Sequence, residues 1–224
     1  MTRHIPNLLT VSRFLMAIAF FVVLGFYNAQ APDGAGWPVL DVAFVIFLVA
    51  VTTDMVDGYL ARKLGHLTTF GRIADPFVDK IIVCGALAYF IGGQFAHVSF
   101  STGVVRHILG AAVPTGGFTI ENLTGWQPWM VAVILARELL VTGMRNFSEV
   151  HKIPFAATLS GKVKMFVQCI AISWSLFYVA HWTQGPEWTR IVRDVLVWTT
   201  TLVTGLSGLI YVKRAYVLLR MPPD

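Results

Sequence analysis

Residues 52–80 read TTDMVDGYLARKLGHLTTFGRIADPFVDK and lie between two long apolar runs. The flanking runs predict two helices, and four aspartates fall near the helix ends that meet in this stretch: Asp54, Asp57, Asp75 and Asp79. The first two are three residues apart and the last two are four residues apart, so each pair shares one face of its helix. If the two helices pack antiparallel, the four carboxylates can converge.

The composition of the whole chain indicates a membrane protein. Hydrophobic residues make up 56% of the 224 residues and charged residues only 13%, about half the share found in soluble domains. Six apolar runs reach the roughly 20 residues that cross a hydrocarbon core. They cover residues 8–27, 39–62, 71–96, 128–147, 158–181 and 191–216. We therefore predict an all-α, polytopic membrane protein, with six transmembrane helices in a single domain, residues 1–224. A loop with Pro32 and Pro38, not a small-residue cleavage site, follows the first run, so we expect that run to be an uncleaved span.

Lysine and arginine predict the orientation of these spans. Six spans put both termini on one side, and most of the basic residues fall on that side: Arg3, Arg62, Lys63, Arg72, Arg145, Lys152, Lys162, Lys164, Lys213, Arg214 and Arg220. The other side holds Arg106, Arg190 and Arg193. This excess predicts that both termini, and residues 52–80, are cytoplasmic. Orientation also explains the net charge of +5, and no basic run or zinc spacing supports nucleic-acid binding. On the opposite side, within residues 97–127, we expect a short interfacial helix near Gly103 to Ala112 and no catalytic role.

The four aspartates suggest a metal site. Like charges in a medium of low dielectric constant repel one another, so four carboxylates need a compensating cation. Hard oxygen ligands favour Mg²⁺, Mn²⁺ or Ca²⁺. Four carboxylates could bridge two such ions, an arrangement suited to phosphoryl transfer. A glycine inside a helix costs about 1 kcal/mol relative to alanine, and close approach of a ligand would explain Gly58 and Gly71. Arg62 could bind a phosphate.

Two other interpretations remain open. The aspartates could pair with Arg62, Lys63, Arg72 and Lys80 at the membrane surface, or they could serve a proton-coupled or cation transporter. Transporters usually place their binding sites near the midplane and use broken helices. Here the acidic residues gather at one membrane face, which favours chemistry at the cytoplasmic interface.

The spacing Asp54-x2-Asp57-Gly58-x2-Ala61-Arg62-x8-Gly71-x3-Asp75-x3-Asp79 resembles the signature of the CDP-alcohol phosphotransferase family at every fixed position. This resemblance implies a six-helix membrane fold, usually dimeric, with two Mg²⁺ or Mn²⁺ ions. It also implies transfer of a phosphatidyl group from CDP-diacylglycerol to an alcohol, with release of CMP. By the same resemblance, Asp54, Asp57 and Asp75 bind metal, and Asp79 is the general base and also a metal ligand. The residues expected to bind the CDP donor are Asp54, Gly58, Ala61, Arg62 and Gly71, with Asn7 and Thr10 from the similar N-terminal segment IPNLLTVSR.

A second group of residues bears on the acceptor alcohol. Arg137 lies inside an apolar run, where a cation is costly. Together with Arg145, Lys162 and Lys164 it could bind an acceptor that carries a phosphate. The segments around these residues are similar to those of the family branch that transfers to sn-glycerol 3-phosphate. The alternatives are a structural Arg137–Glu138 ion pair and, for the two lysines, anchoring at the membrane surface.

The expected reaction joins CDP-diacylglycerol and sn-glycerol 3-phosphate to give phosphatidylglycerophosphate and CMP. The enzyme would be a homodimer in the cytoplasmic (inner) membrane, in contact with membrane lipids, with its active site facing the cytoplasm. Inositol phosphate or serine as acceptor remains an alternative, because a basic pocket also suits inositol phosphate and serine needs fewer cations.

Overall fold

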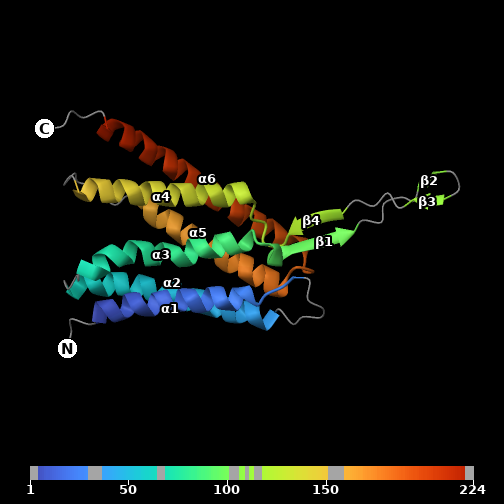
Figure 1. Ribbon diagram of the computed structural model, residues 1–224, viewed down its shortest axis with the longest axis horizontal. Coiled ribbons are helices and arrows are strands. Elements are labelled where there is room, and N and C mark those ends of the chain that lie inside the picture. Colours follow the sequence, from blue (N-terminus) through green and yellow to red (C-terminus); the bar gives the residue numbers. More distant parts are fainter. Residues whose placement is uncertain are drawn as a thin grey trace.

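The computed structural model describes the backbone of residues 5–29, 37–64, 69–100, 106–108, 111–113, 118–150 and 159–219. Side chains are described for residues 11–29, 38–53, 80–96, 121–144, 146, 161 and 163–212. Within these ranges the chain forms six long helices and two short antiparallel strand pairs (Figure 1). The helices are α1 (Ile5–Gly25), α2 (Trp37–Leu64), α3 (Thr69–Phe90), α4 (Pro128–Val150), α5 (Leu159–His181) and α6 (Glu187–Leu219).

The six apolar runs of the sequence correspond to the six helices, and the all-α prediction is confirmed for the bundle. The third run was predicted too long, because α3 ends at Phe90 and not near residue 96. Gly92 has an extended backbone (φ −69°, ψ 155°) and caps a short 3₁₀ helix, Gly93–Phe95, which leads directly into a strand. Two consecutive glycines thus end the helix inside a run that remains apolar.

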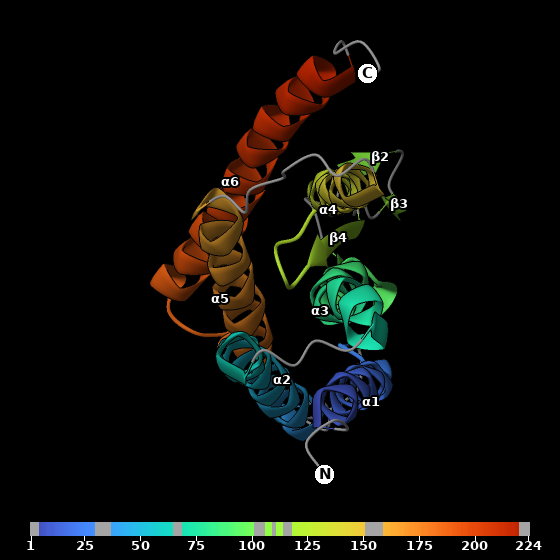
Figure 2. The ribbon, with the colours of Figure 1, turned by 90° about the vertical axis from the view of Figure 1, so that its left-hand side faces the viewer.

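Successive helices run in opposite directions, so α1 begins and α6 ends at the same end of the bundle (Figure 1). Viewed along the bundle, the helices form a ring in the order α1, α2, α5, α6, α4, α3 (Figure 2). Each helix packs against its two neighbours in this ring. The ring order differs from the chain order, and it places α3, α4, α5 and α6 around one part of the interior.

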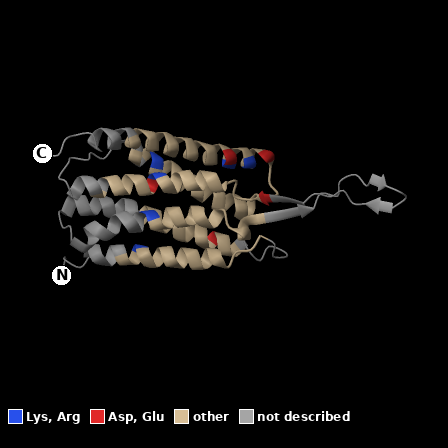
Figure 3. Ribbon diagram, turned by 45° about the horizontal axis from the view of Figure 1, so that its top comes forward, with Lys and Arg blue, Asp and Glu red and all other residues tan. Residues whose placement is uncertain are grey.

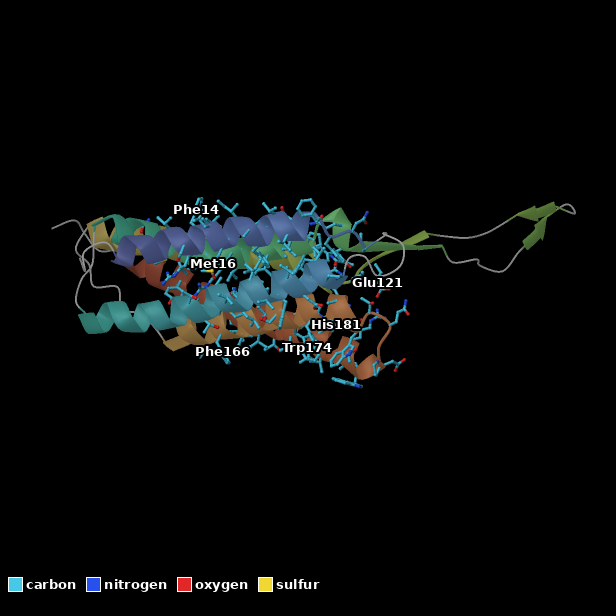
Figure 4. The ribbon with its side chains drawn as sticks, turned by 90° about the horizontal axis from the view of Figure 1, so that it is seen from below. Phe14, Met16, Glu121, Phe166, Trp174 and His181 are labelled. Atoms are coloured by element: carbon cyan, nitrogen blue, oxygen red, sulfur yellow. The ribbon has the colours of Figure 1, made fainter. Side chains whose placement is uncertain are left out.

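Small and large apolar side chains share the helix contacts. Ala17, Ala43 and Ala86 are buried, and Phe20 and Phe47 pack between α1 and α2 with ring centroids 5.7 Å apart. Because lipid tails are as apolar as leucine, helices in a membrane associate through close packing, which small residues permit. In Figure 4, Phe14 and Phe166 point away from opposite sides of the bundle.

The outer faces of the helices are those of a membrane protein. Large apolar side chains are exposed on α1, α2, α4, α5 and α6, among them Leu15, Leu139 and Leu206. Such extensive apolar surface is unusual in water. By length and composition alone, α5 and α6 can cross a bilayer within the described residues, and the described apolar parts of α1, α2 and α3 are shorter. Six spans with cytoplasmic termini therefore stay a prediction.

The segment between α3 and α4 corrects the sequence-based expectation. Strands β1 (Ala96–Phe100) and β4 (Phe118–Asn122) pair antiparallel, with Ala96 opposite Asn122. Strands β2 (Arg106–Ile108) and β3 (Ala111–Val113) form a second pair. The helix expected near Gly103 to Ala112 is therefore wrong over the described residues. Outside that stretch, the alternation of apolar and polar residues in HVSF and FTIE is the period-two pattern of a strand. Within it, pairing of Arg106–Ile108 with Ala111–Val113 replaces the expected helix.

The strands extend away from the bundle at the end opposite to the start of α1 (Figure 1). Their base is tied to the helices by side chains. Asn122 Nδ2 and Thr124 Oγ1 donate to the Phe90 carbonyl at 2.8 and 3.1 Å. Arg193 NH1 of α6 donates to the Leu123 carbonyl at 2.8 Å. These bonds satisfy carbonyl groups that the end of α3 and the strand leave open.

Gly125, which follows this base, requires glycine, and its replacement by alanine is expected to destabilise the protein. Its φ is +77°, and a Cβ atom would lie 2.8 Å from Arg193 Nε. The left-handed backbone alone costs an L-residue about 1–2 kcal/mol. Thermal unfolding in detergent should show a lower melting temperature for Gly125→Ala. Gly93→Ala is the control, because a Cβ atom at that position would have no neighbouring atom within 4 Å. Equal melting temperatures for both variants would contradict this account.

Candidate active site

The four aspartates lie on two helices, in the parts of α2 and α3 that lie toward the same end of the bundle (Figure 1). Asp54 and Asp57 fall within the last turns of α2, and Asp75 and Asp79 within the first half of α3. The helical backbone of both stretches is as expected, and each pair therefore keeps its one-face spacing. α2 and α3 flank α1 in the ring (Figure 2). The side chains of several predicted site residues lie outside the described residues: Asn7, Thr10, Asp54, Asp57, Gly58, Ala61, Arg62, Gly71, Asp75, Asp79, Arg145 and Lys162.

Charged residues of the described part of the chain fall in two bands along the ribbon, one in the half of the bundle near the aspartate-bearing helix ends and one toward the strand end (Figure 3). The first band contains a cluster of four residues, named here the Glu138 cluster: Lys80, Arg137, Glu138 and Lys164. They come from α3, α4 and α5. This cluster contains both predicted acceptor-binding residues whose side chains are described, Arg137 and Lys164.

The carboxylate of Glu138 is the centre of the cluster. Its Oε1 lies 3.2 Å from Arg137 NH1 and forms an ion pair with Lys164 Nζ. Its Oε2 lies 3.8 Å from Lys80 Nζ. The side chains of Arg137, Glu138 and Lys164 are 5%, 6% and 8% exposed, and that of Lys80 is 31% exposed. Three cations thus surround one buried carboxylate, and the two that are themselves buried, Arg137 and Lys164, exceed it by one positive charge among the described side chains.

The Arg137 guanidinium is held from a second side by α6. Its Nε donates to Ser207 Oγ at 3.0 Å, and Ser207 Oγ donates to the Thr204 carbonyl at 2.8 Å. The guanidinium carbon lies 5.2 Å from the centre of the Tyr211 ring, a cation–π contact. Among the described residues, its NH2 nitrogen is buried and has no hydrogen-bond partner.

Lys80 connects the aspartate-bearing helix α3 to α4. It follows Asp79 directly in the sequence, and its Nζ donates to Thr142 Oγ1 and, at 3.5 Å, to the Glu138 carbonyl. Thr142 Oγ1 donates to the same carbonyl at 2.7 Å. The predicted general base is therefore the chain neighbour of a member of the Glu138 cluster, and α3 carries both.

Sequence reasoning treated Lys80 only as a surface partner for the aspartates and did not identify Ser207 or Tyr211. A signal was present in α6, where Thr200, Thr204, Ser207 and Tyr211 recur at helical spacing and are all buried. Polar residues on one face of an apolar helix indicate a face turned to other helices. The pattern does not reveal which of the other five helices that face meets.

An apolar helical bundle that carries two aspartate pairs and a cluster of cations around one buried carboxylate has the groups that a membrane enzyme acting on phosphate esters needs. The chain belongs to the CDP-alcohol phosphatidyltransferase family, whose model matches residues 3–206. Curated relatives extend over nearly the full length. One from Bacillus subtilis, named CDP-diacylglycerol–glycerol-3-phosphate 3-phosphatidyltransferase, is 28% identical over 97% of both chains. One of the same name from Salmonella paratyphi A is 30% identical over 95% of this chain and 94% of its own. A probable phosphatidylglycerophosphate synthase of Mycobacterium tuberculosis is 32% identical over 95% of this chain and 81% of its own.

The family implies a divalent metal ion, and the donor set of the sequence fits one. Carboxylate oxygens are the ligands that Mg²⁺ and Mn²⁺ prefer. Both pairs, Asp54 with Asp57 and Asp75 with Asp79, lie on stretches that the structure describes as helix. In the part of the chain with described side chains, no three His, Cys, Asp or Glu residues gather.

Proposed function

We propose that this protein transfers the phosphatidyl group of CDP-diacylglycerol to sn-glycerol 3-phosphate, giving phosphatidylglycerophosphate and CMP. Family membership supports the phosphatidyl transfer, and the names of the relatives support the acceptor. The structural observation that supports a phosphorylated acceptor is the Glu138 cluster, in which two buried cations share one carboxylate and Arg137 NH2 has no hydrogen-bond partner among the described residues. A phosphate monoester carries about −1.5 to −2 charge at neutral pH and would compensate these cations. Serine offers no such charge.

In this proposal the acceptor phosphate binds Arg137, Arg145, Lys162 and Lys164. Asp79 accepts the proton of the acceptor hydroxyl, whose oxygen forms a bond to the phosphorus that carries diacylglycerol. The bond from this phosphorus to the bridging oxygen breaks, and CMP leaves with that oxygen. Arg62, with Asn7, Thr10, Gly58, Ala61 and Gly71, binds the cytidine diphosphate part.

Asp54, Asp57, Asp75 and Asp79 would hold one or two Mg²⁺ or Mn²⁺ ions. When bound, the metal withdraws charge from the diphosphate and makes CMP a better leaving group. Six spans with both termini in the cytoplasm would place this site at the inner face of the cell membrane. There the donor keeps its acyl chains in the bilayer, and the water-soluble acceptor arrives from the cytoplasm. The homodimer that the family resemblance implies is part of the same proposal.

The test is CMP release by the purified protein in detergent micelles that contain CDP-diacylglycerol and Mg²⁺, with labelled glycerol 3-phosphate, inositol phosphate or serine. We expect labelled lipid from glycerol 3-phosphate alone. Chelation by EDTA should stop CMP release, and added Mg²⁺ or Mn²⁺ should restore it. Product from serine with none from glycerol 3-phosphate would overturn the acceptor. Absence of metal-dependent CMP release with every acceptor would favour the transporter.

A further inference from the structure

We infer that Glu138 is a positioning residue for the acceptor, a role that rests on the proposed function. Its carboxylate fixes Arg137 and Lys164 in one arrangement, so that the unpartnered Arg137 NH2 and the excess positive charge are available to a phosphate monoester. Ser207 supports the same arrangement from α6. Neither residue needs to touch the acceptor for this role.

The Arg137 guanidinium is held by side chains from two helices. Glu138 Oε1 binds Arg137 NH1 at 3.2 Å, and Ser207 Oγ accepts from Nε at 3.0 Å. Two of the three guanidinium nitrogens are therefore fixed by different helices. The third, NH2, is buried and without a partner in the described residues. A buried donor without a partner is costly, whereas a bound phosphate oxygen would satisfy it.

The balance of charge within the Glu138 cluster favours the same role. Arg137 and Lys164 are two buried cations on one buried carboxylate, so among the described side chains they exceed it by one positive charge, which a phosphate anion would compensate. Without Glu138, Lys80, Arg137 and Lys164 would repel one another, and their side chains would separate. The carboxylate therefore keeps the cations close enough together to act on one phosphate.

A second buried arginine in the same bundle differs from Arg137 in its hydrogen bonds. Arg193 of α6 also has an acidic residue directly after it and lies 4.8 Å from the ring centre of Tyr178. All three of its nitrogens have partners: Nε and NH2 contact Asp194 Oδ1 at 2.8 and 2.7 Å, and NH1 donates to the Leu123 carbonyl. A structural arginine in this fold is thus satisfied by one carboxylate and one carbonyl. Arg137 shares its carboxylate with two lysines and keeps an open donor.

The test is the substitution Glu138→Gln, which keeps the shape of the side chain and removes its charge. We expect the KM for glycerol 3-phosphate to rise about 10- to 100-fold, the range of a lost charge-assisted hydrogen bond. The KM for CDP-diacylglycerol should change less than about twofold, because the donor does not depend on these cations. Calorimetric titration of glycerol 3-phosphate into protein without donor or metal should show the same loss of affinity. A purely structural Glu138 would lower the melting temperature and leave both the KM and this affinity unchanged.

Ser207→Ala keeps the inference testable if Glu138→Gln does not fold. Loss of the Ser207 hydroxyl removes only one hydrogen bond to Arg137, so we expect a smaller rise in the same KM, about three- to tenfold. Thr201→Val is the matched control on α6, because within the described part of the chain the buried Thr201 hydroxyl bonds to the Val197 carbonyl of its own helix, at 2.9 Å, and to no other group. An unchanged KM for glycerol 3-phosphate in Ser207→Ala and in folded Glu138→Gln would overturn the inference. A wild-type protein inactive with glycerol 3-phosphate would instead overturn the proposed function on which it rests.

Discussion

Replacing Asp79 with asparagine is expected to lower the rate of CMP release by about 100- to 10,000-fold, the usual contribution of a general base. An amide of nearly the same size cannot accept the hydroxyl proton of the acceptor. It is also a weaker metal ligand, which adds to the loss. The rate is to be measured at saturating CDP-diacylglycerol and glycerol 3-phosphate, so that weaker binding of either substrate does not account for the difference.

The control for this variant is Asp41→Asn. Asp41 lies near the start of α2, and its Oδ1 is 2.8 Å from His181 Nε2 in a partly exposed contact. An exposed pair of this kind contributes about 0–1 kcal/mol to stability. The aspartate-bearing ends of α2 and α3 lie at the other end of the bundle, so turnover should remain that of the wild type. If Asp79→Asn kept full turnover, another residue would be the base.

The helices were predictable because each is a long apolar run, and such runs are the most reliable sequence signal for a helix. The end of α3 could not be predicted in this way, because the apolar run continues from Phe90 through Ile91 toward β1. Gly92 and Gly93 alone mark the break. Strands β2 and β3 were missed for a related reason. The apolar residues of this stretch fit a short helix as well as a strand pair until the pairing of His107 with Ala112 is known.

The sequence predicted several residues of the site, but not which residues of other helices contact them. The sequence identified Arg137 and Lys164, and the structure brings both to Glu138. The sequence could not show that Ser207 meets Arg137, because α4 and α6 are adjacent in the ring but not in the chain. It likewise predicted helical spacing for both aspartate pairs, which the backbone of α2 and α3 supports, whereas their convergence stays a prediction.

The second large effect is expected for Arg137→Met, which should raise the KM for glycerol 3-phosphate about 100-fold or more. Truncating one partner of a buried, hydrogen-bonded charge pair typically costs 2–5 kcal/mol of binding, roughly 30-fold to several thousandfold. Methionine keeps an unbranched apolar stem, which suits the contact of Arg137 Cβ and Cγ with Gly208. Glu138 remains paired with Lys80 and Lys164 in this variant, so the loss of stability should be limited.

Arg137→Lys should recover only part of the affinity, because an ammonium group lacks the planar fork that reaches Ser207, Glu138 and a phosphate together. Arg193→Met supplies the opposite control at the strand end of the bundle. It removes an arginine of similar burial and leaves the Leu123 carbonyl without its donor, so the melting temperature should fall while the KM for glycerol 3-phosphate stays unchanged. The two arginines differ in one respect. All three guanidinium nitrogens of Arg193 have partners, whereas Arg137 NH2 has none among the described residues. If Arg137→Met lowered the melting temperature as Arg193→Met does and left that KM unchanged, Arg137 would be structural and the acceptor would bind elsewhere.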